Sequence, residues 1–430
     1  MPRLPEPRFA PDCTIEVDGR RVAARAGESV AVALLGAGTA LLARSAKYHR
    51  PRGAFCLAGS CFQCLARVDG RPSRRTCRAA CKDGLVVESQ NAVPTAAADL
   101  LGAVDRVYAR GLDHHHLMTW SALANRAAVA ASRQLAGLGH LPSRTPRVAA
   151  APVEERFDAA VVGAGPAGLG AAEALARAGR RVLLVDDGPR LGGRLRCGLA
   201  LPGDPPLAWA GEVAAAVARA GGEVATLTAA AGAWMDGAAP LLALREGDDA
   251  GEGRLRLVRA ARLVLASGTW ALPPTFARND LPGVLAARGV ARALAEDGVL
   301  AGARVAVSGD GAEADALLAL LAGAGAEALR VKEVAAARGG ARLAGLELAS
   351  GGRVRCDALA HAGPRAPASD LARALGAAVA LDAASGGWAV EVDDRGRTAV
   401  AGLLAAGEVT GPMSAAAAAE AGRRAGEAGA

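Results

Sequence analysis

Four cysteines in the first fifth of the chain constrain its fold more than any other feature. They follow the spacing C-x4-C-x2-C-x12-C, at Cys56, Cys61, Cys64 and Cys77. Gly59 and Ser60, between the first two, let the backbone curl and direct N–H groups at sulfur. Thiolates at this spacing can hold a [2Fe-2S] cluster. We therefore expect these four side chains to be the ligands of a one-electron iron-sulfur centre.

The fourth ligand has two candidates, Cys77 and Cys81. Residues 65–71 read as a strand, an Asp69-Gly70 turn and a returning strand, and such a hairpin would carry Cys77 back beside the loop. Cys81 is followed directly by Lys-Asp-Gly, which indicates a turn outside the site, so we favour Cys77. The loop from Cys56 also begins like a plant-type ferredoxin loop.

Two other uses of the cysteines fit the sequence less well. Zinc sites usually show paired C-x2-C knuckles, and only one such pair is present. Disulfides need an oxidising compartment, and nothing resembling a secretory signal precedes the cysteines. An iron-sulfur cluster is the preferred interpretation.

The composition narrows the class of protein. A chain of 430 residues is long enough for two or three domains. The apolar run 31–43 is shorter than the ~18 residues that a membrane helix needs, so we expect no membrane span and a cytoplasmic protein. The net charge is +7, but lysines are few and aromatic residues make up only 3%, which argues against nucleic-acid binding.

The N-terminal part predicts a compact α+β unit. Residues 14–22 alternate around an Asp18-Gly19 turn, and Ser29 precedes an apolar helix that ends near Gly36. Hairpin, helix, cysteine loop and second hairpin together compose a β-grasp ferredoxin-like domain, residues 1–95. Residues 96–152 read as a helical segment and a proline-rich linker. Its three histidines, 114–116, point different ways on any regular element, so we expect a structural or interface role.

A glycine-rich turn follows the linker. The apolar strand from Phe157 leads into G-x-G-x-x-G and then a helix, which is the dinucleotide fingerprint in its usual context. Its residues are Gly163, Gly165, Pro166, Ala167 and Gly168. The next strand, 181–186, ends in Asp186, which we expect to bind a ribose hydroxyl, with Asp187 as the second choice. Helix N-terminus and turn would attract the phosphates.

A second, imperfect motif appears at Gly309 and Gly311, again between a strand and a helix, with Ala314 in place of the third glycine. The strand after it is followed by Lys332 and Glu333, so NADH and NADPH both remain open. A vestigial Rossmann fold that packs without holding a nucleotide is also open.

Three segments carry a resemblance to the two-dinucleotide-domain flavoprotein oxidoreductases: 163–193, 263–268 and 403–411. The resemblance implies FAD at the first fingerprint, with Gly193 and Arg194 beside it. It further implies that Gly268 lies at a domain crossover and that Gly407-Glu408 approaches the flavin ribityl and pyrophosphate. Aspartate is usual there, so Glu408 departs mildly. The implied domains are an FAD-binding domain of residues 153–275 and 376–430, and an NAD(P)-binding-like domain of residues 276–375.

Nearly the whole chain resembles the alpha-type subunits of the sarcosine oxidase-like amine dehydrogenases, a group that includes hydrogen cyanide synthase and opine or proline dehydrogenase complexes. Residues 48–53 and Cys61-Phe-Gln-Cys64 with Cys77 carry the most specific match. The resemblance implies a separate FAD-bearing catalytic partner that oxidises an amine or amino acid. This chain would relay electrons between FAD and a [2Fe-2S] cluster.

Two other functions remain open. One is a stand-alone NAD(P)H-dependent reductase with its own cluster, and the other is an assembly scaffold without redox activity, which the cysteine loop argues against. Cys197 and Cys356 form no C-x-x-C pair, which argues against a disulfide reductase. No residue pattern identifies a general base, so the catalytic residues are left unassigned. The expected fold class is an α+β β-grasp domain followed by α/β Rossmann-like domains.

Overall fold

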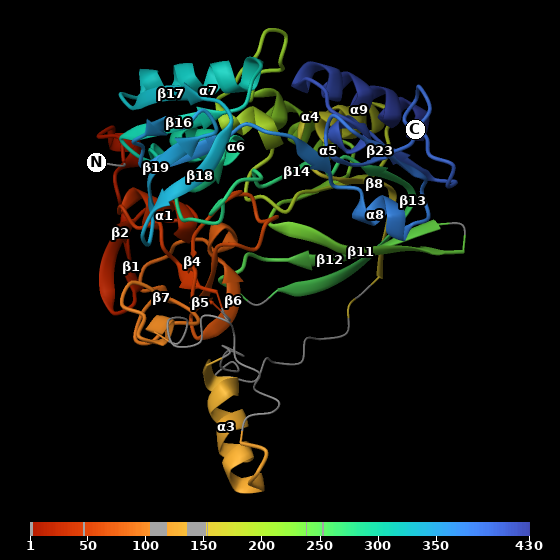
Figure 1. Ribbon diagram of the computed structural model, residues 1–430. Coiled ribbons are helices and arrows are strands. Elements are labelled where there is room, and N and C mark those ends of the chain that lie inside the picture. Colours follow the sequence, from red (N-terminus) through yellow and green to blue (C-terminus); the bar gives the residue numbers. More distant parts are fainter. Residues whose placement is uncertain are drawn as a thin grey trace.

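A computed structural model describes residues 3–45, 48–103, 118–135, 152, 154–237, 239–251 and 253–430. The chain forms a β-grasp domain and two Rossmann-like domains, which lie together in one body (Figure 1). The histidines at 114–116 lie outside the described residues.

The β-grasp domain has a five-stranded sheet in the order β2-β1-β7-β5-β6. Both hairpins turn at the Asp-Gly pairs that the sequence indicated, where the aspartates and glycines all have positive φ. Helix α1 begins after Ser29, whose hydroxyl accepts the Val32 N–H, and its apolar face covers the sheet. The elements are η1 (Pro7–Phe9), β1 (Cys13–Val17), β2 (Arg20–Ala24), α1 (Val30–Gly36), β3 (Ala43–Arg44), β4 (Pro51–Arg52), β5 (Leu65–Val68), β6 (Arg71–Arg75), η2 (Thr76–Arg78) and β7 (Val86–Glu88).

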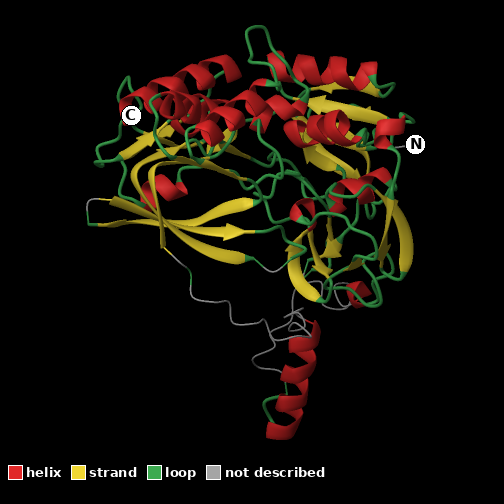
Figure 2. Cartoon of the chain, turned by 180° about the vertical axis from the view of Figure 1, so that it is seen from behind, coloured by secondary structure: helices red, strands yellow, loops and turns green. Residues whose placement is uncertain are grey.

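The segment after this domain contains η3 (Leu101–Ala103) and helix α3 (Ala122–Leu135). Helix α3 stands apart from the other described elements in both views (Figure 2). Helix α3 falls within the segment 96–152, part of which the sequence predicts to be helical.

The first Rossmann-like domain is built on the sheet β10-β9-β8-β13-β12-β11, with β25 on the other side of β13. Strands β8, β9, β10 and β25 are parallel to their neighbours, and the run of buried apolar residues in β9 is typical of a strand covered on both faces. Its elements are β8 (Glu154–Val162), α4 (Pro166–Arg177), β9 (Val182–Val185), η4 (Gly193–Cys197), α5 (Trp209–Arg219), β10 (Glu223–Ala225), β11 (Thr228–Asp236), β12 (Ala239–Glu246), β13 (Arg254–Leu265), β25 (Leu403–Ala405), η5 (Gly407–Thr410) and α9 (Ala415–Gly429).

The second Rossmann-like domain has a parallel sheet in the order β15-β21-β16-β17 and a small antiparallel sheet, β18-β19-β20. Helices α6 and α7 are its two long helices. The elements are β15 (Val284–Ala286), α6 (Ala287–Asp297), β16 (Arg304–Ser308), α7 (Ala312–Gly323), β17 (Glu327–Val331), β18 (Val334–Gly339), β19 (Leu343–Leu348), β20 (Arg353–Val354) and β21 (Ala358–His361).

The chain crosses between the two Rossmann-like domains on a pair of antiparallel strands, β14 (Thr269–Ala271) and β22 (Arg365–Pro367). After β22 it returns to the first domain through α8 (Asp370–Ala374), β23 (Val379–Asp382) and β24 (Gly387–Val390). Ala372 and Leu375 already pack into the core of the first domain. The return therefore begins before residue 376.

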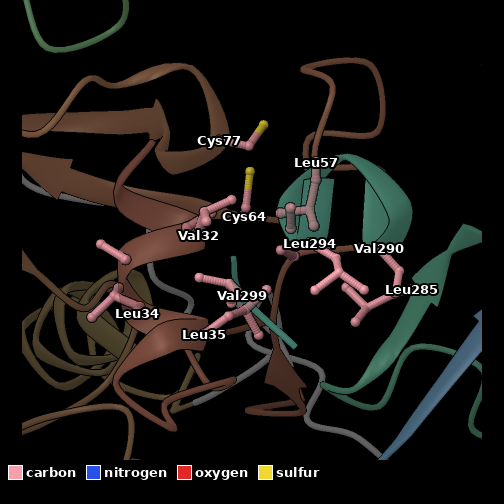
Figure 3. Packing of buried hydrophobic residues seen from close by; sticks show 14 of the residues in the cluster. Val32, Leu34, Leu35, Leu57, Cys64, Cys77, Leu285, Val290, Leu294 and Val299 are labelled. Atoms are coloured by element: carbon pink, nitrogen blue, oxygen red, sulfur yellow. The ribbon is translucent and has the colours of Figure 1, made fainter. Parts of the chain in front are cut away.

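The β-grasp domain and the second Rossmann-like domain share one hydrophobic core. Val32 and Leu34 of α1, Leu57 of the cysteine loop and Leu294 of α6 all belong to it (Figure 3). Burying a leucine stabilises a fold by roughly 1.5–3 kcal/mol, more than an exposed ion pair such as Arg8–Glu6. Apolar packing thus fixes the cysteine loop against α6.

The expected fold class is confirmed by this architecture. In the described part of the chain, no helix combines the length and apolarity needed to span a bilayer.

Candidate functional site

The four cysteines of the loop come together at the edge of the β-grasp domain. Cys56, Cys64 and Cys77 are buried and Cys61 is partly exposed. The Cys56 side chain contacts those of Cys61 and Cys77, and the Cys64 side chain contacts that of Cys77. Figure 3 shows Cys64 and Cys77 next to one another. The contact with Cys61 is the main cause that lowers the pKa of Cys56, and the same contact raises the pKa of Cys61, as expected for thiols close enough to interact directly.

Backbone groups hold the loop in shape. The Ala58 N–H donates to Cys56 Sγ at 3.4 Å, and the Thr76 hydroxyl donates to the Cys64 carbonyl at 2.8 Å. Gly59 has φ +84°, and a Cβ there would lie 2.8 Å from the Arg78 side chain. A side chain at Gly59 would therefore be both strained and crowded.

Cys81 lies away from this group. Its backbone pairs with residues 27 and 28, and burial raises the pKa of its thiol, as expected for an inert core cysteine. Among the described residues no three His, Cys, Asp or Glu side chains converge as the ligands of a single ion would. Pairwise contacts between four thiols suit a two-iron cluster, in which each iron takes two protein sulfurs.

A turn of the first Rossmann-like domain clamps the segment that carries Cys77. Asp249 accepts from the Arg75 Nε at 2.8 Å, and Asp248 accepts from the Ala80 N–H at 2.9 Å. Burial would raise the pKa of Asp249, but Arg75 outweighs burial and the net pKa is lowered. The β12–β13 turn of the first Rossmann-like domain thus fixes Cys77, which belongs to the β-grasp domain.

The first glycine-rich turn has the geometry that the motif requires. Gly163 has φ +100°, and a Cβ there would lie 2.3 Å from the Ala266 carbonyl oxygen. A Cβ at Gly168 would lie 1.7 Å from the Gly163 carbonyl oxygen. A Cβ at Gly165 would meet nothing closer than the Gly193 Cα at 3.9 Å, so Gly165 faces open space. Two glycines are thus needed for packing, and Gly165 leaves room for a ligand.

Asp186 ends β9 beside this turn. Its carboxylate accepts from the Ala164 N–H at 2.7 Å and from the Gly188 N–H at 2.6 Å. Burial is the main cause that raises the pKa of Asp186. The side chain is therefore held in place by the backbone, with lone pairs left over for a hydroxyl donor. Asp187 is more exposed and lies 3.7 Å from Arg78.

One cavity of about 700 Å³ connects the glycine-rich turn with the cysteine loop. Cys56 and Cys77 of the cysteine loop line it, as do Asp186 and Arg190 of the first Rossmann-like domain. The sequence-predicted dinucleotide residues on its wall are Gly163, Gly165, Pro166, Ala167, Asp186, Gly193, Arg194, Gly268 and Glu408. Gly168 and Gly407 support the wall from behind, since a Cβ at Gly407 would lie 2.6 Å from the Ala167 Cβ.

Glu408 belongs to a buried network of two carboxylates and three guanidinium groups. Arg288 donates to Glu408 at 2.7 Å and to Glu313 at 2.7 Å. Arg194 and Arg365 also contact both carboxylates. Burial alone would raise the pKa of Glu408, but the guanidinium groups outweigh burial and lower that pKa to about 2. Glu408 is thus ionised and joins both Rossmann-like domains.

The second glycine motif, at Gly309 and Gly311, packs like the first one, but acidic side chains stand beside it. A Cβ at Gly309 would lie 2.3 Å from the Ala362 carbonyl oxygen, which repeats the contact of Gly163. Asp310 and Asp315, however, stand at the start of α7, and both pair with Arg330. Anionic phosphates would meet these carboxylates at the helix N-terminus. The residues at Gly309 and Gly311 do not fit a pyrophosphate, which favours the vestigial alternative.

The cavity at the first glycine-rich turn, in contrast, has surroundings that fit an anionic nucleotide. The Nε atoms of Arg292 and Arg365 are buried without a hydrogen-bond partner, and both side chains line the cavity. A buried donor without a partner is costly, and an anionic ligand would supply the missing acceptor. These arginines, with Arg288 and Glu313, were missed by the sequence reasoning. No motif marks them, because they are spread over α6, α7 and β22 of an arginine-rich chain.

Comparisons with known proteins agree with both sites. Residues 10–92 match the model of the 2Fe-2S iron-sulfur cluster binding domain, and residues 161–211 match that of the NAD(P)-binding Rossmann-like domain. The HcnA subunit of hydrogen cyanide synthase from Pseudomonas aeruginosa is 41% identical, over 20% of this chain and 82% of its own length. The alpha subunit of sarcosine oxidase from Corynebacterium sp. strain P-1 is 30% identical, over 72% of this chain and 29% of its own.

The chain belongs to the sarcosine oxidase alpha subunit-like family. The alpha subunit of Rhizobium meliloti sarcosine oxidase is 29% identical over 83% of this chain, which spans 40% of that relative's length. The chain is a cofactor-binding protein with a 2Fe-2S domain and an FAD/NAD(P)-binding Rossmann-like domain.

A solved structure has the same architecture. L-proline dehydrogenase from P. horikoshii superposes with a TM-score of 0.75 at 22% identity, over 99% of this chain and 74% of that one. The fold of the whole chain, from β-grasp domain to α9, therefore recurs in an experimental structure.

Proposed function

We propose that this chain is the electron-transfer component of a multi-subunit amine or amino-acid dehydrogenase or oxidase. The observation that carries the proposal is the common cavity, which is lined by Cys56 and Cys77 and also by Gly165. In this proposal Cys56, Cys61, Cys64 and Cys77 hold a [2Fe-2S] cluster, and the first fingerprint holds FAD. A flavin takes up two electrons as a hydride and a [2Fe-2S] cluster takes one, so the pair converts hydride transfer into single-electron steps.

The residues of the chain supply the surroundings for such a relay. Cys56, Cys64 and Cys77 are each less than a tenth exposed, so water is largely excluded from the sulfur side. The Ala58 N–H donates to Cys56 Sγ, and the Arg75 guanidinium, which donates to the Gly59 carbonyl and interacts with Cys77, would stabilise negative charge on the thiolates. The buried network around Glu408 fixes the two Rossmann-like domains in one orientation on either side of the cavity.

The proposal of a partner subunit is based on the relatives of this chain. Those named above are subunits of sarcosine oxidase and hydrogen cyanide synthase, and a component of the opine oxidase of Rhizobium meliloti is 32% identical over 36% of this chain. We propose by likeness that a flavoprotein partner oxidises the substrate, a secondary amine or amino acid such as sarcosine, proline, glycine or an opine. We place the complex in the cytoplasm.

The test is purification of the native complex, with flavin, iron and acid-labile sulfide counted per chain. We expect two irons and at least one FAD per copy of this chain, and dye reduction by one of the candidate amines. A complex without acid-labile sulfide would refute the cluster, and a chain that purifies with no second type of chain would refute the relay role.

The second candidate is a stand-alone NAD(P)H-dependent reductase. The chain alone would then reduce an artificial acceptor with NADH or NADPH. The acidic turn at Asp310 argues against this function, so we expect no such activity above that of free flavin.

A further inference from the structure

Arg292 is a buried cation without a carboxylate partner in the wall of the nucleotide cavity. It lies on α6, in the second Rossmann-like domain, and faces the turn of the first. Its Nη2 donates to the Gly193 carbonyl at 3.1 Å, whereas its Nε is buried without a partner. Among the described residues no carboxylate pairs with it, since Glu296, one turn along the helix, pairs with Arg196.

A guanidinium group in this position is costly unless an anion compensates it. Burial lowers the pKa of Arg292, but the nearby Cys197 and Glu296 outweigh burial and the net pKa is raised, so the group is charged. A buried charge is normally paired, and here the protein supplies hydrogen-bond acceptors only in the Gly193 carbonyl oxygen and the Cys197 thiol, while Glu296 and Asp186 act on the guanidinium charge without bonding to it. The buried Nε donor is therefore left for an acceptor on a ligand.

The space in front of Arg292 is already suited to phosphate. The Gly193 carbonyl that Arg292 binds belongs to a residue whose Cα lies 3.9 Å from where a Cβ of Gly165 would be. Gly165 is the N-cap of α4, a helix of 12 residues, and its N-terminal residues Gly165, Pro166 and Ala167 line the cavity. A helix N-terminus attracts phosphate. Helix N-terminus, open glycine turn and guanidinium thus face one volume from two domains.

We propose that Arg292 binds a phosphate oxygen of the dinucleotide at the first fingerprint, which makes it a cross-domain clamp on the pyrophosphate. This rests on the proposed nucleotide site. The usual fingerprint supplies only backbone donors and a helix end from its own domain. Arg292 adds a charged donor from the facing domain, so nucleotide binding would also hold α6 in place.

The test uses the full chain and measures the displacement of bound FAD, by recovery of flavin fluorescence, with ADP and with adenosine. Arg292→Gln is compared with Arg219→Gln, which removes the same charge from an exposed position at the end of α5, outside the cavity lining. We expect Arg292→Gln to weaken ADP binding by roughly tenfold to hundredfold, the loss typical of one charged hydrogen bond, and to leave adenosine binding unchanged. Arg219→Gln should change the binding of both by less than about threefold.

The outcomes separate the two proposals. If wild-type chain binds neither FAD nor ADP, the nucleotide site itself is refuted and this inference with it. If wild type binds ADP and Arg292→Gln binds it equally well, only the role of Arg292 is refuted. An equal loss of ADP and adenosine would also overturn it, since Arg292 would then merely position the Gly193 turn. Arg292→Lys keeps the charge and should recover part of the ADP affinity, and it replaces the glutamine variant should that one fail to fold.

Discussion

At the residue scale, two glycines of one motif have opposite reasons to be glycine. A Cβ at Gly168 would overlap the Gly163 carbonyl, whereas a Cβ at Gly165 would enter the open cavity. The constraint at Gly168 comes from the folded chain itself, whereas the one at Gly165 comes only from the ligand that the chain would bind. The same distinction applies to the cysteines, since Cys77 touches other thiols and Cys81 does not.

We expect Gly165→Val to fold normally and to lose FAD, because its φ of −77° suits any residue and its side chain would fill the phosphate space. Gly168→Ala should instead lower the free energy of unfolding by roughly 3 kcal/mol or more, because a backbone carbonyl must move. Flavin content after gel filtration tests the loss of FAD, and urea unfolding of both variants tests the difference in stability. A Gly165→Val protein with normal flavin content would refute the site.

Cys77→Ser should remove the visible absorption and the electron paramagnetic resonance signal of the iron-sulfur centre while FAD remains bound. The cluster would lose a ligand, whereas the glycine-rich turn lies on another domain. Cys81→Ser is the matched control, a buried cysteine four residues on, and should keep the cluster. If Cys81→Ser loses the cluster and Cys77→Ser keeps it, the assignment of the fourth ligand is wrong.

At the element scale, helices and strands meet through charge as well as through packing. Five elements are joined by one network, whose members are Glu408 from η5, Glu313 from α7, Arg288 from α6, Arg365 from β22 and Arg194 from η4. Removing one partner from such a network leaves the others buried and unpaired, which costs about 3–5 kcal/mol.

The depressed pKa of Glu408 makes its contribution depend on pH. The folded pKa is about 2 and the unfolded value about 4.3, so the stabilisation is fully present above ~pH 4.3 and is lost as the pH falls toward 2. The pKa difference corresponds to roughly 3 kcal/mol. We expect Glu408→Gln to lower the urea midpoint at pH 7, and the gap from wild type to narrow below ~pH 4.

The matched control is Glu420→Gln, which removes an exposed carboxylate from α9 and should leave the midpoint unchanged. A gap between wild type and Glu408→Gln that stays constant from pH 7 to pH 3 would show that the carboxylate charge is not what stabilises the network.

At the scale of the whole molecule, the β-grasp domain is docked on both Rossmann-like domains. Gly289 of α6 lies against the cysteine loop, and a Cβ there would come within 2.6 Å of the Cys56 carbonyl oxygen. The Ala286 N–H also donates to the Phe55 carbonyl at 2.9 Å. The loop that carries the first cysteine thus rests directly on the start of α6.

We expect Gly289→Ala to weaken this docking and to lower the melting temperature, by the equivalent of about 1–3 kcal/mol of overpacking. Gly211→Ala is the control, a helical glycine on α5 with nothing near its Cβ position, and should be neutral or stabilise by ~0.5–1 kcal/mol. Calorimetry and the rate of limited proteolysis measure both. Equal behaviour of the two variants would mean that the loop does not rest on α6.

Sequence reasoning predicted the parts of this molecule that depend on neighbours along the chain. The turns at Asp18-Gly19 and Asp69-Gly70, the Ser29 cap and the strand-turn-helix around Gly163 all lie where expected, because φ preference, capping and hydrophobic period are local properties. The four cysteines could be grouped for the same reason, since a short loop and one hairpin bring them together.

Only the tertiary structure decided which charges meet. Arg288, Arg292 and Arg365 resemble the many other arginines of the chain until packing buries them, and Glu313 reads as a surface residue of its helix. Their roles depend on burial and on partners far along the chain, such as Glu408 for Arg288, 120 positions away. The sequence does not show which arginines become buried. Folding removes water from around Arg292, and only then does the lack of an acceptor for its Nε–H become costly.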